Sequence, residues 1–146
     1  MINGVSVREL MVFENELGGV KHMLKKQWPE FKDFGEIYFS IINAGIVKGW
    51  KKHDRTILNY TVPLGNVKVV IYDCNEKSNS FGNIQEIEIG EKNHVLLTIP
   101  PNVWYSFASL NNQKAMICNL ISIEHSEDNH HQIDLDSNEI PYKWPK

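Results

Sequence analysis

Apolar and polar residues alternate along much of this 146-residue chain, in short runs that end at turn residues. An alternation of period two is the pattern of a half-buried β-strand. Clusters of Gly, Pro and Asn, such as Pro63-Leu64-Gly65-Asn66, separate the runs and are typical of tight turns. Short strands at this spacing predict an all-β sandwich or barrel. The clearest runs lie at 37–41, 58–64, 67–71, 86–89, 95–99 and 117–123.

Length and composition predict one globular domain, residues 1–146, with enough apolar content (42%) for a core. A net charge of −3 gives no overall attraction to nucleic acid or to an anionic membrane. The N-terminus has no basic start followed by an apolar run, and no stretch approaches the ~18 apolar residues of a membrane span. Cys74 and Cys118 lie in or beside apolar runs and are interpreted as reduced thiols, so we expect a cytoplasmic protein.

The segment Gly45–His53 combines a strand pattern with positive charge. In a regular strand Lys51 and His53 share one face and Lys48 points to the other, but a bulge at Gly49 would turn Lys48 to the same side. With Lys52 and Arg55 the lysines form a cationic patch. Two interpretations stand: a site for an anionic ligand such as a diphosphate, or a solvated strand edge whose lysines oppose aggregation.

Two further positions point to a pocket. After Pro100-Pro101, Tyr105 and Phe107 fall on one strand face, either as core aromatics or as a platform for a sugar or base. Asn119 lies on the apolar face of its strand, so its amide needs a backbone partner or a cavity. The polar tail also contains three histidines whose spacing fixes no coordination geometry, and we expect no metal there; they are His125, His130 and His131.

The ordered set of motifs resembles the dTDP-4-dehydrorhamnose 3,5-epimerase family, and in particular its short relatives. The resemblance implies a cupin fold, that is, a double-stranded β-helix or jelly roll, usually in a homodimer. It also implies nucleotide-linked 4-keto-6-deoxy sugars as ligands, no cofactor, and a strand at Val20–Lys25. The matching segments are Glu16–Lys25, Gly35–Trp50, Val67–Asp73, Ser80–Gly82, Ile99–Phe107 and Ile140–Trp144.

The family's catalytic positions are largely substituted in this chain. Lys51 stands where the family has its catalytic His, and Tyr105 stands where it has a second His. Asn119 stands where the family has the Tyr that acts as the catalytic acid. Lys48 keeps a cationic position, and His53 matches the second residue of a His-x-His pair found in short relatives. A lysine side chain is a neutral amine, able to act as a base near neutral pH, only if its pKa falls by roughly 3 units from ~10.4.

We therefore expect an epimerase- or isomerase-like protein of surface-polysaccharide sugar biosynthesis with a rebuilt active site. The alternative is a sugar-nucleotide-binding or regulatory cupin module without catalysis. In the first interpretation the catalytic candidates are Lys51, His53 and Tyr105. The substrate-binding candidates are Lys48, Arg55, Phe107 and Asn119.

Overall fold

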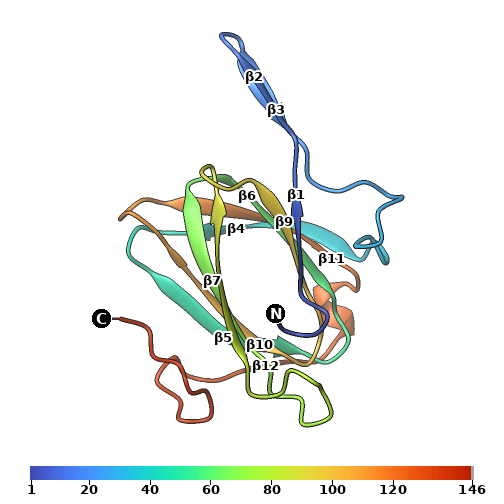
Figure 1. Ribbon diagram of the computed structural model, residues 1–146, viewed down its shortest axis with the longest axis vertical. Coiled ribbons are helices and arrows are strands. Elements are labelled where there is room, and N and C mark those ends of the chain that lie inside the picture. The colour runs from blue at the N-terminus through green and yellow to red at the C-terminus, as the bar shows by residue number, and fades with distance from the viewer. Residues whose placement is uncertain (146) are drawn as a thin grey trace.

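The computed structural model describes residues 1–145, and its two large sheets face each other as a jelly roll without an α-helix (Figure 1). All strand pairs are antiparallel, as expected for a jelly roll. The first sheet has the order β1 (Ser6–Glu9), β9 (Val95–Ile99), β6 (Leu58–Leu64), β11 (Ala115–Ile121), β4 (Glu36–Ile42). The second has the order β12 (His130–Gln132), β5 (Val47–His53), β10 (Trp104–Ser109), β7 (Asn66–Tyr72), β8 (Ile84–Gly90).

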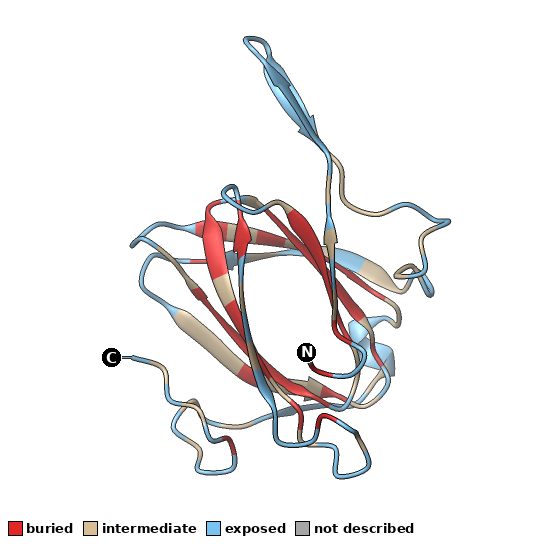
Figure 2. Ribbon diagram, viewed as in Figure 1, coloured by how far each residue is buried: buried red, intermediate tan, exposed pale blue. Residues whose placement is uncertain are grey.

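The main core lies between the two sheets, as Figure 2 shows by the buried inner strands. Alternation places every second residue of β7 in it: Val67, Val69 and Ile71 are fully buried there. Strands β6, β9 and β11 contribute in the same way, so the period-two pattern of the sequence is the pattern of this core. The predicted all-β jelly roll is confirmed. Within residues 1–145 no helix has the length and hydropathy of a membrane span.

The C-terminal segment covers the outer face of the second sheet. It packs Ile140, Tyr142 and Trp144 around the fully buried Trp50 of β5. The indole Nε1 of Trp144 donates a 2.8 Å hydrogen bond to Ser106 Oγ on β10. The sequence-based expectation that Tyr142 and Trp144 hold the tail against the barrel is therefore confirmed.

A short two-stranded arm, β2 (Val12–Asn15) with β3 (Gly18–Lys21), projects from the barrel (Figures 1 and 2). The strand expected at Val20–Lys25 is wrong in its extent, because β3 ends at Lys21 and residues 22–35 form no strand. Residues of that irregular stretch instead lie beside the outer face of the first sheet, where Met23, Leu24 and Phe31 line a groove with Ile37 and Leu120.

Strand β4 turns its apolar side away from the core. Ile37, Phe39 and Ile41 are 49%, 61% and 45% exposed, whereas Tyr38 packs against the core. Strand β4 is an edge strand of the first sheet, and about half of this apolar stripe is exposed in the described residues.

Candidate functional site

A bulge in β5 sets which side chains enter the barrel. Lys51 pairs with Tyr105 of β10, but the next pair joins Gly49 to Ser106, and Lys48 then lies opposite Phe107. The shift of register leaves Trp50 as the extra residue of the bulge. The predicted bulge at Gly49 is therefore confirmed, and Lys48 and Lys51 share a sheet face with Tyr105 and Phe107.

Gly49 is required at this bulge for two physical reasons. Its φ of +134° lies in a region that residues with a Cβ rarely adopt. A Cβ at this position would also overlap the Cβ of Ser106 on the neighbouring strand. The glycine thus allows the two strands to approach where the register changes.

His53 and Tyr105 form a buried hydrogen-bonded pair. His53 Nε2 lies 2.8 Å from the Tyr105 hydroxyl, and the rings stack with centroids 5.8 Å apart. Burial is the main cause that lowers the pKa of His53 to about 4, although the charge of Asp128 partly opposes it. Burial also raises the pKa of Tyr105 well above its usual value. At neutral pH the pair is therefore a neutral imidazole against a neutral phenol.

The opposite wall of the barrel supplies a second polar pair. Asn119 of β11 lies between Tyr38 of β4 and Tyr60 of β6 in register, and its Nδ2 donates a 3.1 Å hydrogen bond to the Tyr38 hydroxyl. Its Oδ1 is buried without a hydrogen-bond partner. Burial raises the pKa of Tyr38, partly offset by that hydrogen bond. The expectation that Asn119 faces inward is confirmed, and its amide is not satisfied by the backbone.

Aromatic rings connect the two walls. Tyr60 meets Tyr105 edge to face at 6.3 Å between centroids and Phe107 at 6.2 Å. The candidates that the structure brings onto the inner surface are Lys48, Lys51, His53, Tyr105, Phe107 and Asn119.

The remaining cations of the patch lie elsewhere. Lys52 faces the outer side of the sheet, with its ammonium 4.9 Å from the centroid of the Trp104 ring. Arg55 follows β5 with its side chain 65% exposed, and its Nη2 donates a 2.7 Å hydrogen bond to the carbonyl of Glu127. The sequence patch is therefore split between the interior, the outer face and the rim.

Asp128 was missed by the sequence reasoning and holds the rim together. Its Oδ2 accepts hydrogen bonds from the backbone N–H of Arg55 at 3.0 Å and of Thr56 at 2.9 Å, and from the Thr56 hydroxyl at 2.6 Å. Burial alone would raise the pKa of Asp128, but these bonds and one from Asn129 lower it to about 2. Tyr38 and Tyr60 were also missed, because only long-range strand pairing brings them beside Asn119.

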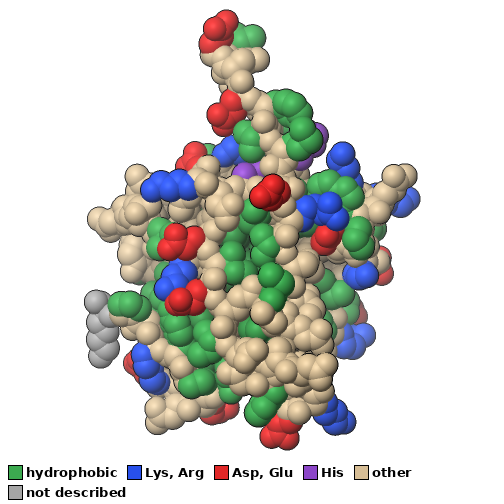
Figure 3. Space-filling view, in the orientation of Figure 1, with side chains coloured by type: hydrophobic (Ala, Val, Ile, Leu, Met, Phe, Trp, Pro, Cys, Tyr) green, Lys and Arg blue, Asp and Glu red, His purple; other side chains and the backbone are tan. Residues whose placement is uncertain are grey.

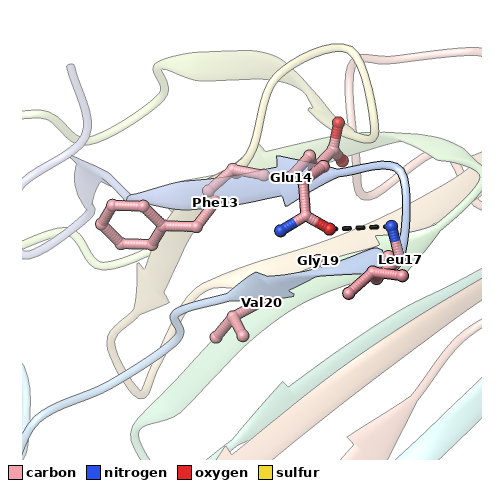
Figure 4. A pocket seen from close by; sticks show the side chains of 8 residues that line it. Phe13, Glu14, Leu17, Gly19 and Val20 are labelled. Carbon is pink, nitrogen blue, oxygen red and sulfur yellow. Dashed lines mark hydrogen bonds between the residues drawn. The ribbon is translucent and has the colours of Figure 1, made fainter.

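A separate depression lies on the projecting arm, between its two strands (Figure 4). Phe13, Leu17 and Val20 line it, and the N–H of Leu17 donates a 2.8 Å hydrogen bond to Asn15 Oδ1 at the turn. Figure 3 shows hydrophobic and acidic side chains exposed along this arm. The depression shares no residue with the inner surface of the barrel. Among residues 1–145 no three His, Cys, Asp or Glu side chains are placed to hold a metal ion.

Comparisons with known proteins agree with this architecture. A crystal structure of a dTDP sugar isomerase from Desulfovibrio desulfuricans is 38% identical, with a TM-score of 0.94 over 98% of this chain and 92% of that one. The probable low-salt glycan biosynthesis epimerase Agl13 of Haloferax volcanii is 29% identical over 81% of this chain and 77% of its own length. The spore coat polysaccharide biosynthesis protein SpsL of Bacillus subtilis is 26% identical over 99% of this chain and 97% of its own.

The sequence model of the dTDP-4-dehydrorhamnose 3,5-epimerases matches residues 1–146. The jelly roll is accordingly the cupin fold of these relatives, and the resemblance seen in the motifs is confirmed over the whole chain. The chain belongs to the dTDP-4-dehydrorhamnose 3,5-epimerase family.

Proposed function

We propose that this chain epimerises or isomerises a nucleotide-linked 4-keto-6-deoxy sugar, with His53 and Tyr105 as the groups that move the proton. The observation that supports the proposal best is their buried 2.8 Å hydrogen bond, on the sheet face that also receives Lys48 and Lys51. A neutral imidazole held by a phenol is a suitable pair for general acid–base catalysis.

The chemistry needs three groups. The ketone of the sugar acidifies the neighbouring C–H, a base removes that proton, and the electron pair moves onto the carbonyl oxygen as an enolate. A cation or hydrogen-bond donor must stabilise that oxygen, and an acid then returns a proton to the carbon. We assign Lys51 to stabilise the enolate oxygen; its pairing with Tyr105 across the strands supports this assignment.

His53 is assigned as the base and Lys51 as the cation. Burial lowers the pKa of His53 to about 4, so its imidazole is neutral and able to accept a proton at neutral pH. A lysine could serve as the base there only as a neutral amine. That form costs about 4 kcal/mol at neutral pH, the equivalent of a fall of roughly 3 pKa units. Lys48 Nζ donates a 2.7 Å hydrogen bond to the Ile41 carbonyl and retains donors for a phosphate or the enolate.

The Tyr38–Asn119 pair supplies the opposite wall. The Tyr38 hydroxyl reaches the interior from the first sheet, whereas His53 and Tyr105 belong to the second sheet. Epimerisation needs proton removal and return on different faces of the sugar, so we assign Tyr38 as the returning acid. The unpartnered Oδ1 of Asn119 is placed to accept a hydrogen bond from a sugar hydroxyl.

The rest of the ligand is assigned from the surroundings of this pair. Phe107, which is 7% exposed and packs against Tyr60, is assigned as a contact of the sugar or base. Arg55 at the rim is assigned as a contact of the phosphate. The name of the Desulfovibrio protein supports a dTDP-linked sugar, and those of the Haloferax and Bacillus relatives support glycan or polysaccharide synthesis. The free cysteines Cys74 and Cys118 fit the reducing cytoplasm, where we place the activity.

The experiment is deuterium incorporation from heavy water into a dTDP-linked 4-keto-6-deoxy sugar, followed by mass spectrometry and proton NMR. Wild type should place deuterium beside the ketone. His53→Gln and Tyr105→Phe should each reduce incorporation by roughly 10²-fold or more, the usual contribution of a general acid or base. Lys52→Met is the matched control for Lys51→Met, because Lys52 lies on the outer face of the same strand and its loss should leave the rate unchanged.

The same samples separate the two functions that the substitutions suggest. The Lys at position 51 and the Asn at position 119 favour the alternative, a sugar-nucleotide-binding or regulatory module without catalysis. Tight binding of the nucleotide sugar by calorimetry, with no deuterium incorporation, would establish that alternative and exclude the enzyme. Absence of both binding and exchange would exclude both.

We also infer a homodimer. The apolar stripe of β4 and the apolar side chains of the arm are exposed in one chain, and the arm projects away from its own barrel (Figure 2). A second copy covers such surfaces reciprocally in a two-fold interface and also protects the β4 edge. Phe39→Glu should shift the mass measured by light scattering from about twice the chain mass to the chain mass. Lys68→Glu, on the other sheet, should leave it unchanged, and a monomeric wild type would overturn the inference.

A further inference from the structure

Three histidines gather at one end of the barrel. His130 of β12 lies directly opposite His53 of β5 in the antiparallel register, so both side chains point to the same face. His125 belongs to the 3-10 turn η1 (His125–Glu127). Its ring centroid lies 4.6 Å from that of His130 and 6.5 Å from that of His53, and His130 and His53 are 6.2 Å apart.

The three rings lead from the interior to solvent. His53 is only 6% exposed, whereas His125 and His130 are exposed at the rim. A hydrogen-bonded water can bridge two ring nitrogens that lie too far apart for a direct hydrogen bond. The Tyr105 hydroxyl holds Nε2 of His53, which leaves Nδ1 for a partner on the path outward.

The electrostatics of His53 require such a path. The titratable groups that face it are Tyr105 of β10, Lys51 of its own strand, Asp128, His125 and His130. Burial is the main cause that lowers the pKa of His53 to about 4; the charge of Asp128 opposes this, and His130, His125 and Lys51 add to it. An imidazolium formed there by taking up a substrate proton is therefore a strong acid, and the residue that carries it is only 6% exposed.

We propose that His130 and His125 relay protons between the buried His53–Tyr105 pair and solvent. The substrate C–H proton passes to the Tyr105 oxygen as the Tyr105 hydroxyl proton moves to Nε2 of His53, while the electron pair of the C–H bond goes onto the enolate. The imidazolium so formed carries a second proton on Nδ1. The proton then leaves through a bridging water to His130, and through His125 to bulk water or buffer, which restores neutral His53 for the next turnover. This inference rests on the function proposed for the pair, and it identifies the route by which that pair exchanges protons with solvent.

The test uses His125→Gln, His130→Gln and the double variant at low buffer concentration. Deuterium incorporation by the double variant should fall at least about tenfold, and added imidazole should restore most of it, because a soluble base then replaces the relay. Wild type should be insensitive to imidazole. His131→Gln is the matched control: His131 also lies on β12, but it bonds Asp54 at 2.8 Å and pairs in register with Lys52.

The outcomes distinguish the relay from the function on which it rests. Wild-type-like exchange in the double variant, or a loss that imidazole does not restore, would overturn the relay. A wild type that shows no exchange would instead contradict the proposed function. In that case NMR decides whether the relay exists. The rate at which the His53 ring N–H exchanges with water should fall in the double variant and not in His131→Gln. An unchanged rate overturns the proposal.

Discussion

The unpartnered amide oxygen of Asn119 makes a prediction about stability with an unusual sign. Asn119 is 1% exposed, its Oδ1 has no hydrogen-bond partner, and its Nδ2 donates one bond to Tyr38. Most substitutions of buried residues destabilise a protein. We expect Asn119→Val to stabilise this one while it weakens ligand binding, because the polar group is retained for the ligand and not for the fold.

The magnitude follows from three contributions. Removing a buried unsatisfied acceptor gains about 1–3 kcal/mol, and losing the hydrogen bond to Tyr38 costs about 1 kcal/mol. Burying a valine methyl in place of amide atoms adds about 0.8 kcal/mol, and a β-branched residue suits a strand. The sum is a gain of about 2 kcal/mol, which corresponds to a rise in Tm of roughly 4–8 °C for a domain of this size.

Thermal and urea unfolding of the two proteins measure this change, with Thr61→Val as the matched control. Thr61 is also buried on a strand of the first sheet, but its hydroxyl donates a 3.1 Å hydrogen bond to the Val95 carbonyl. Its replacement should cost about 1 kcal/mol. If Asn119→Val lowers the stability as much as Thr61→Val does, the amide is structural and the assignment of its oxygen to a ligand is refuted.

Three further substitutions test the surroundings of the site. Gly49→Ala should lower the free energy of unfolding by about 2–3 kcal/mol, because it adds strain at a φ of +134° to an overlap with Ser106. Gly82→Ala, at a φ of +85° with open space around it, should cost only about 1 kcal/mol. If the two substitutions lower the free energy of unfolding equally, the close approach of Gly49 to Ser106 does not matter for stability. His53→Gln should flatten the pH dependence of stability: an unfolded His binds a proton near ~6.5 and the folded one only near 4. Wild-type stability should therefore fall as the pH drops from about 6.5 to about 4, by at most about 3 kcal/mol, and a variant with the same slope would exclude His53 as the cause. Trp144→Phe should lower the free energy of unfolding by about 1 kcal/mol through the lost hydrogen bond to Ser106. In a Ser106→Ala background the same substitution should cost nothing. An unchanged cost in that background would show that the indole acts through packing alone.

The sequence was informative wherever a local rule decides the structure. Alternation identified the strands of the core, and a glycine next to Trp50 identified the bulge that turns Lys48 inward. The two faces of a strand are also local, so Tyr105 and Phe107 could be placed together before the structure was known. These inferences depend on steric properties of one to three neighbouring residues.

Long-range pairing was the part that the sequence could not supply. Asn119 and Tyr38 meet because β11 pairs with β4, and no local pattern gives the partner or register of a strand. The same limit explains β4 itself: alternation defines an apolar face, but that face is turned away from the core. The strand predicted at Val20–Lys25 is wrong beyond Lys21, because apolar residues such as Met23 and Leu24 can line a groove without forming a strand.

The substitutions at the family's catalytic positions have a structural logic once the neighbours are included. Residues in register on adjacent antiparallel strands have Cβ atoms about 4.5–5.5 Å apart, so β4 can supply a hydroxyl close to the position on β11 where the resemblance implies the family's catalytic Tyr. Asn119, which stands at the position of the family's Tyr by the resemblance, donates a hydrogen bond to the Tyr38 hydroxyl. In the same way, Tyr105 holds His53 on the next strand. Under the proposed assignment each wall of the barrel keeps a proton-carrying group at a changed position along the chain, so the substitutions inferred from the resemblance are compatible with the proposed chemistry.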